Sequence, residues 1–149
     1  MNAQNTQAAA TAEAGERIER SVVIDAPRER VWRAWTEPAE LARWWGKRGW
    51  STPPESVTLD VRPGGTFRLN SINDEDGREM PLDTTFREVV EPERLTFGEA
   101  TVTFADLGDG RTEMVFHTTV HMTAETLRTA TGGLASAFDR LTDHLERTP

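Results

Sequence analysis

The chain has 149 residues, about the size of one domain, and 36% of them are hydrophobic, so it is long enough to bury a single core. Its formal net charge of -8 and its scattered basic residues argue against a nucleic-acid partner, because a phosphate backbone is itself negative. With no cysteine it has neither disulfides nor thiolate metal sites, and no stretch approaches the roughly 20 apolar residues that span a bilayer.

Residues 1–16 are predicted to form a disordered tail ahead of a single folded domain at 17–147. The tail is rich in Ala, Gln, Asn and Thr, with no basic opening segment and no leucine-rich run, so it does not resemble a secretion signal. Because this signal and cysteine are both missing, we expect a cytoplasmic protein.

One strand and two short helices are predicted at the start of the domain. Residues 17–25 alternate between apolar and polar positions, which is the two-residue period of a half-buried strand. Asp25 stands two residues before a proline and is predicted to cap the first helix. The same order of cap and proline returns at 36–38, and the second helix is expected to end at Gly46.

From residue 56 to residue 121 the pattern changes to alternation broken by closely spaced turns. The connections are too short for crossover helices, so this pattern predicts an antiparallel meander. Turns are predicted at three places, 63–65, 73–77 and 91–93. The apolar parity changes at Gly98 within 95–104, and we interpret this change as a bulge in one continuous strand.

A long C-terminal helix is predicted over 123–147, since five leucine and phenylalanine residues recur there at helical spacing opposite a charged face. Gly132 and Gly133 interrupt the pattern and predict a kink or the close approach of another backbone. One strand, two short helices, about six further strands and a long helix around one core make an α+β domain.

This order of elements, together with five sequence phrases, resembles the activator of heat-shock-protein-90 ATPase homologue family within the START-like superfamily. The resemblance covers about residues 17–147. The phrases are APRERVWRAWTEPAELARWWG (26–46), LDVRPGGTFRL (59–69), FREVVEPERLTF (86–97), VTFADLGDGRTEM (102–114) and FDRLTDHL (138–145).

The resemblance implies a helix-grip fold, in which a curved antiparallel sheet of seven strands wraps around the long helix. It also implies a cavity between sheet and helix that relatives use for an apolar ligand, with no single reaction attached. Our leading hypothesis is a noncatalytic protein that binds a small hydrophobic or aromatic ligand there without a cofactor. The residues expected to line the site are Trp35, Trp44, Phe67, Leu69, Phe86, Phe97, Phe116, Leu134, Phe138 and Leu141.

Two features bear on the shape of this cavity. Leu134 follows Gly133 where related sequences often have tryptophan, and Glu99-Ala100 stands where many relatives have a strand tryptophan, so the pocket is expected to differ in shape and polarity. All five tryptophans lie between residues 32 and 50. Each of them either packs in the core, the more frequent role, or contacts the ligand, and Trp32, which lies off the apolar stripe, is expected to be the most exposed.

Other chemistry has weaker support in the sequence. His117 and His121 lie four residues apart on a predicted strand, about 13 Å, which is too far for one metal ion, so no metal site is predicted. Asp83 and Glu99 are the candidates for acid–base chemistry, which needs a carboxylate among apolar neighbours. The acidic run 74–76 lacks the distal glutamate of a calcium loop and is interpreted as a solvated turn.

Two rival functions follow from the resemblance. A polyketide-cyclase-like enzyme would use the same cavity and would need polar groups converging inside it. A chaperone ATPase-activating module is suggested by the family name alone and would need a large exposed apolar patch. A monomer and a homodimer are both compatible with the sequence, and no membrane partner is expected.

Overall fold

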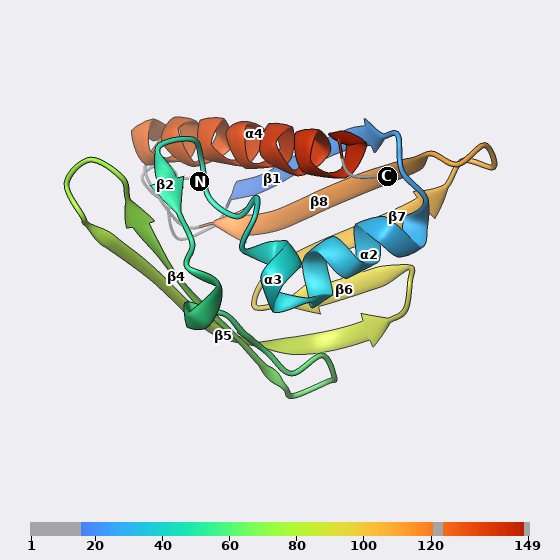
Figure 1. The fold of residues 1–149 in the computed structure, drawn as a ribbon, viewed down its shortest axis with the longest axis horizontal. Coiled ribbons are helices and arrows are strands. Elements are labelled where there is room, and N and C mark those ends of the chain that lie inside the picture. Colours follow the sequence, from blue (N-terminus) through green and yellow to red (C-terminus); the bar gives the residue numbers. More distant parts are fainter. Residues whose placement is uncertain (1–15, 121–123, 148–149) are drawn as a thin grey trace, which may run out of the picture.

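The structure is a computed structural model that describes residues 16–120 and 124–147. A curved antiparallel sheet holds a long C-terminal helix across its concave face, and two short helices follow the first strand (Figure 1). The elements are β1 (Glu16–Ile24), α2 (Arg28–Thr36), α3 (Pro38–Leu41), β2 (Trp50–Ser51), the 3-10 turn η1 (Pro54–Ser56), β3 (Thr58–Leu59), β4 (Thr66–Asn73), β5 (Glu79–Val90), β6 (Arg94–Phe97), β7 (Ala100–Asp106), β8 (Thr112–Val120) and α4 (Ala124–Arg147). The expected α+β helix-grip fold is confirmed.

The sheet has eight strands in the order β1-β8-β7-β6-β5-β4-β2, with β3 paired to β4 on the side. Strands β4 to β8 pair with their neighbours in chain order, so the predicted meander is confirmed. The first strand then pairs with the last, which brings the two ends of the domain together. The sheet exceeds the implied seven strands because β2 and β3 are two-residue pairings along β4.

Strand parity decides which side chains point toward α4. In β7 and β8, Val102 lies opposite Phe116 and Phe104 opposite Met114, and all four side chains are buried. Their neighbours of the other parity lie on the outer face, as expected for a sheet that is covered on one side only. A bulge between Phe86 and Glu88 increases the bend of β5.

The apolar faces of α2 and α4 close the core against this sheet. Val31, Ala34 and Trp35 of α2 are completely buried, and Phe138 and Leu141 of α4 are at most 2% exposed. These residues belong to one continuous cluster with the inward side chains of the strands. Burial of each large side chain contributes about 1.5–3 kcal/mol, so packing against the sheet holds both helices.

Three local predictions are corrected by the structure. The parity change at Gly98 is a two-residue turn between β6 and β7, not a bulge, because Phe97 pairs directly with Ala100 and Gly98 has a φ of 57°. The first helix begins after Pro27 with no side-chain cap, so Asp25 is not its N-cap. The helix predicted to run to Gly46 ends at Leu41, and turns continue the chain.

The expectation for Trp32 was also wrong, since this side chain is only 5% exposed. Its ring stands edge-on to Phe104, with the two centroids 5.8 Å apart. The apolar stripe of α2 is therefore wider than its spacing suggests, because the helix packs into the curve of the sheet. None of the described helices is long and apolar enough to cross a membrane.

The predicted C-terminal helix is confirmed as one uninterrupted helix, α4, through Gly132 and Gly133. Among the described residues, no backbone from outside the helix comes within 4 Å of a Cβ atom placed at either glycine: one at Gly133 would meet the Lys47 Cδ at 3.8 Å, and one at Gly132 would meet nothing. Most of the predicted tail, residues 1–15, lies outside the described residues, and β1 begins at Glu16, one residue ahead of the predicted domain start.

We expect Gly132→Ala to raise the free energy of unfolding by about 1 kcal/mol, because alanine loses less backbone entropy than glycine in a helix. The added methyl group enters open space. Urea denaturation followed by circular dichroism measures the change.

Gly65→Ala is the matched control for this measurement. Gly65 is buried, and a methyl group there would overlap the carbonyl oxygen of Asp60, so we expect a loss of stability of about 1–3 kcal/mol. A destabilised Gly132→Ala variant would show that the helix needs glycine at that position.

Candidate functional site

The ten residues expected to line a ligand site lie together between the sheet and the helices. Nine of them are buried members of the core cluster, and Leu134 is half-buried against it. Elements far apart in the chain supply them: α2, the turn after α3, four strands and α4. They are Trp35, Trp44, Phe67, Leu69, Phe86, Phe97, Phe116, Leu134, Phe138 and Leu141.

The aromatic members pack on one another, and we call them, with Trp45, the ring cluster. Trp35 lies at its centre, with ring centroids 4.8 Å from Trp44, 6.3 Å from Phe138 and 6.4 Å from Phe116. Its indole nitrogen donates a hydrogen bond of 3.3 Å to the Met114 sulfur. Such edge-on and tilted pairs add about 0.5–1.5 kcal/mol each beyond burial, so side chains fill this half of the interior.

Beyond the ring cluster, the concave face of the sheet carries smaller and more polar side chains. By register, Ala100 lies between Phe97 and Thr118 in one row across β6, β7 and β8, and Ser71 is the inward residue after Leu69 on β4. Small or hydroxylated residues thus take the places where rings stand elsewhere. We call Ser71, Ala100 and Thr118 the small-residue floor. Figure 1 shows the N-terminal half of α4 beside the C-terminal end of β8.

Two polar contacts order the floor. The hydroxyl groups of Ser71 and Thr52 are 2.9 Å apart, and Thr52 donates in turn to the Trp45 carbonyl at 3.2 Å. Across the floor, the Thr118 hydroxyl donates to the Glu99 carbonyl at 3.2 Å. These hydroxyl oxygens can still accept a hydrogen bond, so a ligand here would meet apolar walls with a few polar anchors.

Residues 45–50, which we call the strap, close the side between β4 and α4. The strap reverses direction at Gly46 and Gly49, whose φ values are 97° and 93°. A Cβ atom at Gly46 would lie 3.7 Å from the Ser71 hydroxyl oxygen and 3.9 Å from Arg140, so the strap bridges the floor and the helix. Leucine or alanine at either glycine would be strained, because that backbone region favours glycine.

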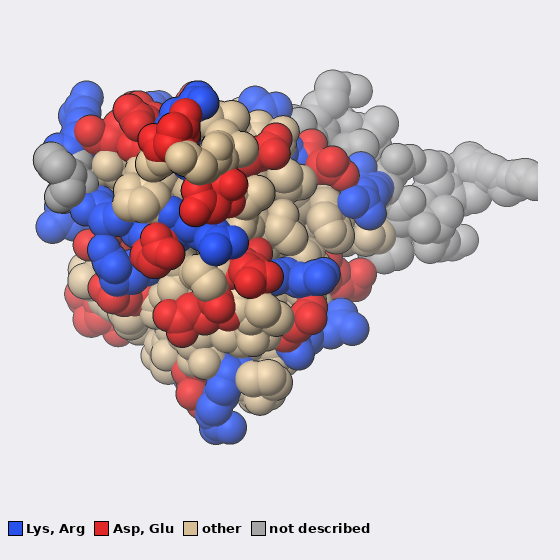
Figure 2. All heavy atoms as spheres, turned by 90° about the vertical axis from the view of Figure 1, so that its right-hand side faces the viewer, with Lys and Arg blue, Asp and Glu red and all other residues tan. Residues whose placement is uncertain are grey.

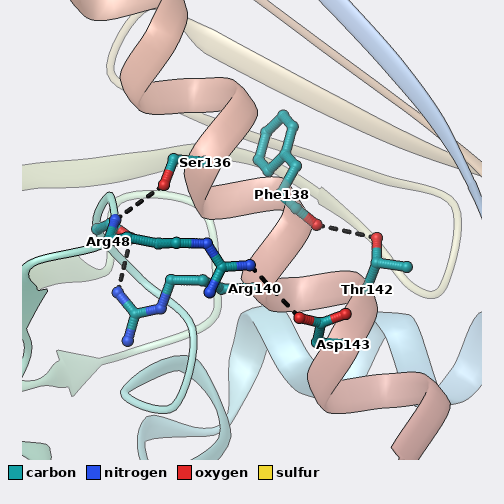
Figure 3. A network of polar contacts seen from close by, with 7 residues as sticks. Arg48, Ser136, Phe138, Arg140, Thr142 and Asp143 are labelled. Carbon is teal, nitrogen blue, oxygen red and sulfur yellow. Dashed lines mark hydrogen bonds and ion pairs between the residues drawn. The ribbon is translucent and has the colours of Figure 1, made fainter.

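Arg140 of α4 holds the strap in place. Its Nη1 atom donates to the carbonyl of Gly46 at 2.8 Å and to that of Trp50 at 3.1 Å, with longer contacts to the two carbonyls at 45 and 47. The backbone N–H of Arg48 donates to the Ser136 hydroxyl at 2.8 Å, and its guanidinium pairs with Asp143 (Figure 3). Burial lowers the pKa of Arg140 from its ordinary value, and the Arg48 cation lowers it further.

Another polar contact joins the same helix to α3, nearer its C-terminus. The His144 Nε2 atom is 2.9 Å from a carboxylate oxygen of Glu40 in α3, and the histidine side chain is only 11% exposed. The C-terminal half of α4 is thus tied by polar contacts to both the strap and α3.

The carboxylates considered for acid–base chemistry do not reach the interior. Asp83 is exposed and pairs with Arg68 at 3.4 Å, and Glu99 is exposed in the β6–β7 turn. The buried polar side chains of the described residues are Thr52, Ser71 and Thr112. The described part of the interior therefore offers hydroxyl groups and no buried acid or base.

The residues considered for metal binding lie in two separate parts of the structure. His117 is half-buried on β8, opposite Thr101, and His121 lies outside the described residues. Residues 74–76 form the turn after β4, where the side chain of Asp76 pairs with Arg78 at 2.8 Å. Backbone and side-chain hydrogen bonds from Arg78 lower the pKa of Asp76. Among the described residues no three histidine, aspartate or glutamate side chains are grouped to hold a metal ion.

Sequence reasoning missed the small-residue floor and the strap. Continued alternation from Phe67 and Leu69 would have placed Ser71 on the inner face, and continued alternation from Phe116 would have placed Thr118 there.

Figure 2 shows basic and acidic side chains interspersed on one side of the molecule, so that face has no continuous basic surface for a phosphate backbone.

A family model described as "Activator of Hsp90 ATPase homolog 1-like protein" matches residues 25–146. No curated protein matches the chain. A protein of Nitrosomonas europaea is similar in structure, with a TM-score of 0.75 and 23% identity over 88% of this chain and 94% of that one. A Chromobacterium violaceum protein has a TM-score of 0.74 and 23% identity over 88% and 98%, and the AHSA1 protein of Silicibacter pomeroyi has 0.74 and 16% over 90% and 100%.

We expect Arg140→Leu to lower the free energy of unfolding by about 2 kcal/mol, because a charged donor shared among several carbonyls is lost. The backbone N–H groups of Arg48 and Trp50, which are bonded to Ser136 and Lys47, should then exchange with solvent faster. Urea denaturation and hydrogen exchange measure the two effects.

Arg147→Leu provides the control, since this arginine is exposed in the last turn of α4. Its stability should stay within about 0.5 kcal/mol of the parent. Unchanged exchange in the strap of Arg140→Leu would contradict the role given to Arg140.

Proposed function

The chain belongs to the activator of Hsp90 ATPase homolog 1-like family, and from this premise we propose that it binds a small hydrophobic or aromatic ligand between the sheet and α4. The ligand would lie on the small-residue floor, beneath the N-terminal half of the helix. The ring cluster and its three aliphatic neighbours, Leu69, Leu134 and Leu141, would form the inner wall of this site.

The observation that carries this proposal is the change from large to small side chains along one concave face. On β8 the inward position after Phe116 is Thr118, and Ala100 lies between Thr118 and Phe97 in the row across β6, β7 and β8. The helix α4 lies across the same concave face (Figure 1). Small side chains beneath α4 support the proposal of a space there, suited to a flat apolar molecule.

The border of the ring cluster supplies apolar surface for such a ligand. Trp45 and Leu134 are only half-buried, unlike Trp35 and Trp44 beside them. Trp45 lies at the edge of the cluster, 5.6 Å from Phe67 by ring centroids. A ligand that covered Trp45 and Leu134 would gain roughly 25 cal/mol for each Å² of apolar surface removed from water.

The polarity of this region favours an uncharged ligand. The buried polar groups are the Ser71 and Thr52 hydroxyls, and Thr118 supplies a third hydroxyl. A charged ligand would lose its hydration with no opposite charge among these groups to compensate. A neutral molecule with one hydroxyl or carbonyl group fits the arrangement best.

The rival functions have less support. Acid–base catalysis of the cyclase kind would need ionisable groups inside, and both candidate carboxylates are exposed. A chaperone-binding module would need a contiguous apolar patch. The large hydrophobic residues that are exposed in the described part of the chain, Val23, Met80, Val90 and Leu107, lie on β1, at the two ends of β5 and in the β7–β8 turn.

We expect Ala100→Leu to weaken binding of 1-naphthol, a neutral aromatic probe, by about tenfold, because the larger side chain fills the floor. Tenfold corresponds to about 1.4 kcal/mol. Fluorescence titration measures the affinity, and Thr118→Leu, at a half-buried and more tolerant position, repeats the test if Ala100→Leu folds poorly.

Ala105→Leu is the matched control, since Ala105 lies on the same strand with opposite parity and is exposed. It should bind the probe as the parent does. The proposal fails if neither floor variant changes the affinity, or if the parent protein shows no saturable binding.

A further inference from the structure

A second concave site opens on the outer side of α2, away from the small-residue floor. It is a groove of about 780 Å³, within the roughly 300–1,000 Å³ of small-molecule sites. The groove lies between α2, Val61 after β3 and the end of β5 with its following turn, and Figure 1 shows α2 on the same side as the end of β5. Its lining consists of Glu29, Trp32, Arg33, Thr36, Glu37, Val61, Val89, Glu91 and Pro92.

The floor of the groove is apolar and held in place by the core. Trp32 is buried edge-on against Phe104, and Val61 and Val89 pack against the same core cluster. The chain after Val61 is fixed to β5, since the backbone N–H of Gly64 donates to the Phe86 carbonyl at 2.8 Å. The groove is therefore formed by fixed elements.

The walls of the groove are charged, and the charge is mostly negative. Glu29 and Arg33 lie on α2 and Glu37 is the residue directly after it, and Glu91 lines the groove from the β5–β6 turn. Three glutamates and one arginine leave a formal charge of -2. None of these four side chains forms an ion pair with another described residue, although ion pairs join eight other pairs.

Unpaired carboxylates around an apolar floor indicate the chemistry of a ligand. A small anion would be repelled by the excess negative charge. A bare metal ion does not fit, because the described residues contain no cluster of three close carboxylates. A larger molecule that carries a positive group and an apolar body would satisfy both the floor and the walls.

We propose that the α2 groove binds a small organic cation, an ammonium group attached to an apolar or aromatic body. The body would cover Trp32, Val61 and Val89, and the ammonium group would lie against the negatively charged wall that the glutamates form. The α2 groove is separate from the proposed interior site, which favours neutral ligands. A test that contradicts one proposal therefore leaves the other unchanged.

Benzylammonium tests the proposal on the full chain, with phenylacetate as an anion of similar size and shape. The indole N–H signal of Trp32 in the NMR spectrum, assigned with Trp32→Phe, should move saturably with benzylammonium. The signal of Trp50, which lies in β2 outside the groove, should stay in place. Phenylacetate should bind at least about tenfold more weakly, as expected for a charge-selected site.

Glu37→Gln and Glu91→Gln should each weaken benzylammonium binding about three- to fivefold, a range typical of partly exposed charge contacts. Glu99→Gln, an exposed glutamate in the β6–β7 turn, should leave the affinity unchanged. All three variants keep the size of the side chain, so they are expected to fold.

Equal affinity for benzylammonium and phenylacetate, or no shift at Trp32 up to the solubility of the amine, would overturn the proposal. It would also be overturned if only a basic peptide bound, because the groove would then be a docking surface for a protein segment. The Glu37→Gln and Glu91→Gln variants should bind 1-naphthol as the parent does. A loss of benzylammonium binding in these variants then belongs to the α2 groove and not to the interior site.

Discussion

The burial of Trp35 is the interaction on which the rest of the structure depends. This one side chain, completely buried, joins α2 to β8 through Met114 and Phe116 and to α4 through Phe138. Its position relative to three separate elements is fixed by ring packing, which tolerates little displacement because interiors are close-packed. The depth at which both helices lie on the sheet follows from this packing.

Polar contacts hold the strap against α4, in addition to the ring packing that holds both helices on the sheet. Arg140 is half-buried without a carboxylate among its described hydrogen-bond partners, and carbonyl groups of the strap satisfy its donors instead. Directional contacts of this kind hold the strap in one place, where packing alone would allow it to slide. The ring cluster packs in one part of the interior, and the proposed ligand site lies beside it, at Ser71, Ala100 and Thr118.

Much of the fold could be predicted from local patterns. Alternation in the strands and the helical spacing near the C-terminus are properties of neighbouring residues. The structure confirms the elements they predict, except that the strand predicted over 95–104 is two strands, β6 and β7. The ten apolar residues expected around a cavity do lie together, because parity and helical phase decide which side of an element is buried. Contact with a ligand is a further step, and for these residues it stays a proposal.

The sequence by itself determined the order of the elements and the apolar faces that form the core. Only the tertiary structure decided that Trp32 is buried, that Gly98 is in a turn, and that Thr118 lies opposite Ala100, because these outcomes depend on strand register and on how deeply a helix packs. The α2 groove has the same origin, since its walls lie more than fifty residues apart in the chain. Local spacing says which way a side chain points, and three-dimensional packing decides what it meets.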